Sequence, residues 1–138
     1  EATLFAPDGV NGDNFGPVTL FRVYPDGVDT FSVPDRERTD PRCRELLLAH
    51  NDYNRRIFDA IQQEALQGHG VVLSMTDCYR HTDYGEPIVA LKSYILSPFS
   101  EDRHVGTVIE SIAKARRQID TGTRPSPSGP PSAKDDEC

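Results

Sequence analysis

The chain has 138 residues, of which 36% are hydrophobic and 27% charged, and its formal net charge is −7 at pH 7. This length suits one domain with a single core, and the acidic balance disfavours nucleic acid as a partner because it repels phosphates. No apolar run approaches the roughly 18 residues that a membrane span requires, so no membrane partner is expected.

The first third of the chain predicts an irregular arm followed by a β-hairpin. Residues 1–16 contain several glycine and proline breakers, which is typical of an irregular N-terminal arm. Two β-rich runs then flank Pro25-Asp26-Gly27. Because Pro presets φ and Gly accepts the left-handed conformation, this tripeptide favours a tight turn between two paired strands.

A polar linker leads into a long amphipathic helix, predicted over 41–67. Asp40 can cap this helix, and Pro41 fits the first helical position. Apolar residues then recur at spacings of three and four. Gly68 and Gly70 mark its end.

The second half of the chain repeats the order of two strands and a helix. Strands are predicted for "VVLSMTDC" and "PIVALKSYILS", joined by a polar loop as a second hairpin. A helix capped by Ser100 or Asp102 follows and extends to about Asp120. Residues 121–138 are rich in Pro and Ser and predict a flexible, disordered tail.

The predicted order is ββαββα. It favours an α+β fold over residues 17–120, with a four-stranded, mainly antiparallel sheet and two helices packed on one face. The alternative is an open α/β arrangement with a right-handed crossover between the second and third strands.

The segment "SMTDCYRHTDYGEP", residues 74–87, gathers most of the chemically reactive side chains. Cys78, His81 and Asp83 could form a thiol, a general base and an orienting carboxylate. Neighbours in one turn seldom hold the geometry that nucleophilic catalysis requires, so a solvated hairpin loop is the favoured interpretation. Carboxylate pairs carry little information in a chain with 22 acidic residues.

The three cysteines are Cys43, Cys78 and Cys138, and they form no C-x-x-C pair. The predicted helix from residue 41 and the strand that runs back along it bring Cys43 and Cys78 to the same end of the domain. This geometry predicts a disulfide between them. Cys138 would then remain as a free thiol in the tail.

Neither a metal nor a cofactor is predicted. No two of the histidines, His50, His69, His81 and His104, have the i, i+4 spacing of a helical metal pair. Gly68 and Gly70 precede a strand, whereas a phosphate-binding loop follows one. We expect His50, on the long helix, to be partly buried with a satisfied hydrogen bond.

A candidate binding surface consists of residues that the predicted hairpins place at their ends: Tyr79, Arg80, Tyr84 and Tyr24. Tyrosine and arginine are enriched in the energetic hot spots of protein interfaces. Another protein is therefore the expected partner.

The function expected from these features is that of a small, non-enzymatic protein-binding domain of the effector, inhibitor or accessory type. The chain begins at Glu1, which fits a secreted product of signal-peptide cleavage or a trimmed cytoplasmic protein. One alternative is a hydrolase that uses Cys78 or a carboxylate with His81. Another is a structural or assembly subunit that joins a neighbour by β-augmentation.

Overall fold

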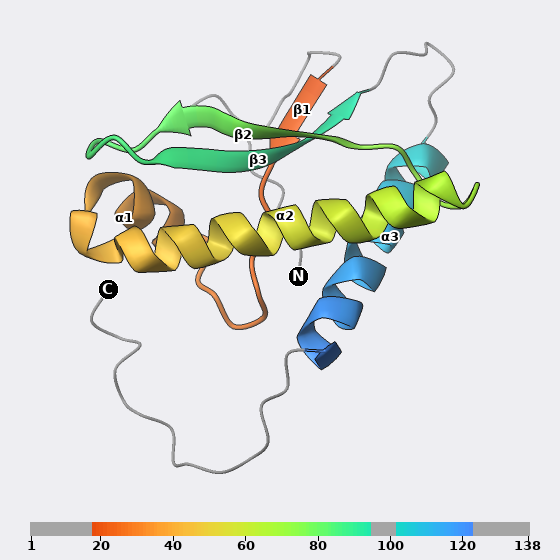
Figure 1. Ribbon diagram of the computed structural model, residues 1–138, viewed down its shortest axis with the longest axis horizontal. Coiled ribbons are helices and arrows are strands. Elements are labelled where there is room, and N and C mark those ends of the chain that lie inside the picture. Colours follow the sequence, from red (N-terminus) through yellow and green to blue (C-terminus); the bar gives the residue numbers. More distant parts are fainter. Residues whose placement is uncertain (1–17, 95–101, 123–138) are drawn as a thin grey trace.

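The computed structural model describes residues 18–94 and 102–122, with side chains of the last helix placed from residue 105 (Figure 1). The expected arm, most of the expected tail and Cys138 lie outside these ranges. The elements within them are β1 (Val18–Phe21), α1 (Val33–Thr39), a 3-10 turn η1 (Pro41–Cys43), α2 (Arg44–Leu66), β2 (Ser74–His81), β3 (Pro87–Tyr94) and α3 (Asp102–Gly122).

The strands form an antiparallel sheet in the order β1-β3-β2, with β3 in the centre. β1 pairs with β3 from Val18 opposite Tyr94 to Phe21 opposite Leu91. Figure 1 shows α2 running along one face of β2 and β3, while α3 crosses near the C-terminal end of α2. None of the described helices is long and apolar enough to cross a membrane.

The expected four-stranded sheet with two helices is wrong, because the chain beyond the first turn enters a helix. The turn itself is present: Val28 N–H donates to the Pro25 carbonyl at 3.4 Å, and Gly27 has a φ of 86°. The Asp29 carboxylate then accepts from Phe31 N–H at 2.9 Å and from Ser32 Oγ at 2.6 Å. These local bonds compete with strand pairing and lead directly into α1.

The polar stretch that was expected as a linker is thus α1, which starts with a proline in its first turn. The expected cap at Asp40 is confirmed, since its carboxylate accepts from Arg42 N–H at 3.0 Å. Hydrogen bonds from the Arg42 side chain and backbone lower the pKa of Asp40 to about 2. The long helix is also confirmed, although its first turn is the 3-10 turn η1.

The second hairpin is confirmed, and its last strand lies at the centre of the sheet. Residues 88–91 are all buried, as expected for a strand that is apolar on both faces. Gly85, at a φ of 90°, closes the turn between β2 and β3, with its N–H donating to the Thr82 carbonyl at 3.0 Å.

The hydrophobic core lies between the sheet, α2 and α3. Its members are Phe21, Val23, Tyr53, Ile57, Ile61, Leu73, Leu91, Ile112, Ala115 and Ile119. The i, i+4 positions Tyr53, Ile57 and Ile61 form the stripe of α2 that faces this core. Each large aliphatic side chain buried here contributes roughly 1.5–3 kcal/mol relative to exposure.

Candidate functional site

The carboxylates of residues 74–87 are engaged in ion pairs with arginines of α1 and α2. Asp77 pairs with Arg55 at 3.1 Å, and Asp83 pairs with Arg38 at 3.3 Å. Glu86 completes the set by pairing with Arg44 of α2 at 2.5 Å. These pairs are exposed and individually weak, but together they hold the β2–β3 hairpin against both helices. None of the three carboxylates is therefore positioned toward the thiol of this segment.

Cys78 and His81 do come together. The Cys78 sulfur lies 3.7 Å from Nδ1 and 3.6 Å from Nε2 of His81, and 3.4 Å from the Arg80 carbonyl oxygen. Both side chains are exposed. Asp83, the expected orienting carboxylate, binds Arg38 instead, so among the described residues the pair lacks the third member of a catalytic triad.

The expected Cys43–Cys78 disulfide is wrong: Cys78 is an exposed free thiol, whereas Cys43 is completely buried in η1. β2 begins at Ser74 rather than at residue 71. Cys78 therefore lies nearer the start of its strand than the sequence suggested, and it does not reach the end of α2 where Cys43 lies. The neighbouring Asp77 reaches only Arg55, which lies about 18 Å along the helix from Cys43 at 1.5 Å per residue.

The strongest polar constellation is a buried cluster that the sequence did not reveal as a unit. Glu37 of α1, with no exposed surface, accepts from Arg22 Nη1 at 2.9 Å and from the Tyr24 hydroxyl at 3.1 Å. Its other carboxylate oxygen lies 2.5 Å from Nδ1 of His50. The expected hydrogen bond of His50 is present, and at 4% exposed this residue is buried more deeply than expected.

Two asparagines of α2 complete this cluster by taking the place of a strand. Asn51 accepts from Val89 N–H at 3.0 Å and donates to the Pro87 carbonyl at 2.9 Å. Asn54 accepts from the N–H of Val23 at 2.8 Å and donates to the carbonyl of the same residue at 2.9 Å. These amides satisfy backbone groups of β3 and of the chain after β1 where sheet pairing has stopped.

The cluster is almost completely closed to solvent. Tyr24, Glu37 and His50 are each no more than 5% exposed. Burial raises the pKa of Tyr24 well above its usual range; Arg22 opposes this shift, and Glu37 and Tyr79 add to it. The cluster was visible in the sequence only as polar residues at core spacings of α2, since Arg22 and Glu37 carry no local signal.

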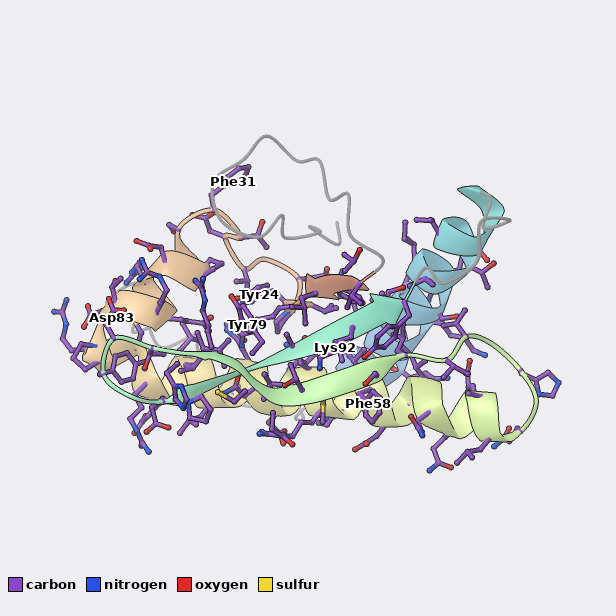
Figure 2. The ribbon with its side chains drawn as sticks, turned by 90° about the horizontal axis from the view of Figure 1, so that it is seen from above. Tyr24, Phe31, Phe58, Tyr79, Asp83 and Lys92 are labelled. Atoms are coloured by element: carbon purple, nitrogen blue, oxygen red, sulfur yellow. The ribbon has the colours of Figure 1, made fainter. Side chains whose placement is uncertain are left out.

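The expected binding residues have different environments. Tyr84 donates from its hydroxyl to the Glu37 carbonyl at 2.7 Å, and Tyr24 is buried. Tyr79 is 40% exposed, and the Arg80 guanidinium carbon lies 5.3 Å from the centre of its ring. Figure 2 places Tyr79 next to Tyr24, which agrees with the influence of Tyr79 on the pKa of Tyr24.

A bulge in β2 presents Tyr79 and Cys78. Thr76 pairs with Ala90 and Arg80 with Ile88, so three residues of β2 stand opposite one residue of β3. A bulge of this kind interrupts pairing and redirects side chains at a sheet edge.

The described residues contain no group of three or more His, Cys, Asp or Glu side chains that could hold a metal ion. No protein-family model, curated protein or solved structure matches the chain.

Proposed function

We propose that the chain is a non-enzymatic protein-binding domain of the effector, inhibitor or accessory type, which acts outside the cell on another protein. The observation that carries this proposal is exposed Tyr79 on the bulge of β2, with the guanidinium of half-buried Arg80 over its ring. An aromatic ring with a guanidinium over its face is an arrangement common in interface hot spots.

The surroundings of this pair support recognition more than chemistry. The nearby carboxylates are bound by arginines, and Cys78 and His81 are both exposed. Because Tyr79 and Arg80 already contact each other, less side-chain entropy is lost when a partner covers them.

The proposal is tested by replacing the tyrosine and arginine together. Protein carrying Tyr79→Ala and Arg80→Ala is compared with the native chain in affinity capture from extracellular fluid, followed by measurement of the affinity for each captured protein. We expect binding to weaken about 30-fold, the effect of losing about 2 kcal/mol at a hot spot.

A matched control is Leu66→Ala, because Leu66 is 74% exposed at the far end of α2. This variant should bind like the native protein. Equal affinity of the double variant and the native chain, with circular dichroism showing both folded, would refute the proposal.

A thiol hydrolase is the second candidate, and the contact between Cys78 and His81 is the observation that favours it. If the imidazole activates the thiol, His81→Ala should slow the alkylation of Cys78 by iodoacetamide at pH 7. Peptide mass mapping measures the rate of this alkylation. An unchanged alkylation rate eliminates this candidate without affecting the first.

A further inference from the structure

The turn after β1 and helix α3 enclose a cleft of about 250 Å³. Its lining includes Tyr24, Asp26, Phe31 and Arg116. This volume lies below the roughly 300–1,000 Å³ of ordinary small-molecule pockets, so the cleft suits one side chain of a larger partner.

Arg116 gives the cleft its chemical character. Its side chain is only 11% exposed, and its Nη2 donates to the carboxylate of Asp26. Its Nε is buried and has no hydrogen-bond partner within the described part of the chain. Nε and Nη2 form the edge of a guanidinium that can bind both oxygens of one carboxylate, and here only half of that edge is used.

Asp26 holds its place at Arg116 only weakly. The Asp26 side chain is 80% exposed, so water screens the ion pair. Because Nε is buried in the present arrangement, an incoming carboxylate must displace Asp26 to reach both Nε and Nη2. It would then satisfy a donor that Asp26 leaves unbonded.

Phe31 adds an apolar contact at the rim of the same cleft. It is 92% exposed, although its backbone N–H is fixed by Asp29 at 2.9 Å. Figure 2 shows Phe31 standing out from the loop before α1.

From these observations we propose that the cleft binds an acidic side chain of a partner protein, flanked in that partner by an apolar residue. Arg116 receives the carboxylate, Asp26 competes with it from within the chain, and Phe31 contacts the apolar neighbour. The inference rests on different residues from the Tyr79–Arg80 surface and can hold or fail separately.

The test follows the Nε–Hε signal of Arg116 by NMR in the full chain. Three probes are titrated: a blocked Phe-Glu dipeptide, its neutral Phe-Gln counterpart, and glutarate as a free acid. We expect the Phe-Glu peptide to shift this signal saturably at millimolar concentration, and the Phe-Gln peptide to bind at least about tenfold more weakly.

Two substitutions define the roles within the cleft. Asp26→Ala removes the internal competitor and should tighten binding of the Phe-Glu peptide about twofold to fivefold. Arg116→Lys keeps the charge but loses the fork, and should weaken binding about tenfold, whereas Arg117→Lys, at an exposed neighbour on α3, should have no effect.

Absence of a saturable shift at Arg116, equal binding of the two peptides, or weaker binding after Asp26→Ala would overturn the proposal. Tighter binding of glutarate than of the Phe-Glu peptide would overturn the assignment to a protein side chain. If Arg116→Lys alters the amide spectrum globally, two substitutions at exposed positions still decide the outcome. Asp26→Ala should tighten binding of the Phe-Glu peptide, and Phe31→Ala should weaken it.

Discussion

Glu37 supplies the buried carboxylate that compensates the buried guanidinium of Arg22. Its carboxylate accepts from Arg22 and Tyr24 and contacts His50, all within a region almost without exposed surface. Burial of charge costs several kcal/mol per ion unless partners compensate, so each member depends on the others being present.

Glu37→Gln is therefore expected to destabilise the protein by about 3–5 kcal/mol, because it leaves the Arg22 guanidinium buried without its counter-ion. Urea unfolding followed by circular dichroism measures this change. Asp83→Asn, which removes an exposed pair with Arg38, should cost less than about 1 kcal/mol. If both variants lose a similar amount of unfolding free energy, the buried cluster contributes no more to stability than an exposed ion pair.

At the level of single residues, the sequence predicted the cap at Asp40 and the buried state of His50, since both follow from position on a helix. It could not predict the contact of Arg22 with Glu37. Arg22 follows β1 and Glu37 belongs to a helix that was not expected, and only the assembled fold brings them together.

At the scale of elements, α2 supplies hydrogen bonds that β1 is too short to provide. β1 ends at Phe21, so the backbone of β3 from Pro87 to Val89 lacks a strand partner on that side. The Asn51 side chain donates to the Pro87 carbonyl and accepts from Val89 N–H, and it also accepts from Arg22 Nη2 at 3.1 Å.

Asn51→Ala should raise the hydrogen-exchange rate of the Val89 amide by about tenfold or more, because an unsatisfied buried donor costs about 1–3 kcal/mol. Exchange measured by NMR in the native state tests this directly. Leu91, which lies within the paired register of β1 and β3, is the internal control. If the two amides respond equally, the substitution has destabilised the whole domain without specifically opening this edge.

The elements that the sequence predicted correctly are those with strong periodicity, namely α2, α3 and the β2–β3 hairpin. The prediction of a second strand in the first hairpin was wrong because local hydrogen bonds outweighed the β propensity of this segment. Asp29 bonds to Phe31 and Ser32, and a proline-initiated helix begins immediately afterwards. The secondary structure of a short apolar run depends on such contacts more than on its composition.

Across the whole molecule, one core joins all the layers. Ile57 has no exposed surface and belongs to the cluster that includes residues of β1, β3 and α3. Because this cluster spans the sheet and both long helices, the described domain should unfold as one cooperative unit.

Ile57→Ala should lower the free energy of unfolding by about 2–5 kcal/mol through lost burial and the cavity left behind. Chemical unfolding monitored by both fluorescence and circular dichroism should show coincident transitions. Leu66→Ala, at a position 74% exposed, should change stability by no more than about 0.5 kcal/mol. Separate transitions for the two probes would contradict a single core.

The candidate site was predictable in part. The sequence identified Tyr79, which is exposed, and Arg80, which is half-buried, together with Tyr24 and Tyr84, whose hydroxyl groups bond to Glu37. It could not show the Arg116 cleft, because Asp26 and Arg116 stand at opposite ends of the described chain. Side chains that meet only through tertiary packing leave no local pattern.

The strand order β1-β3-β2 also has a consequence for biosynthesis. β1 has no partner in its sheet until the ribosome has produced Tyr94, while α2 and the β2–β3 hairpin are close in sequence and can assemble first. Among the described strands, the first to emerge is thus the last to be incorporated, and it remains unpaired while the rest of the sheet is synthesised.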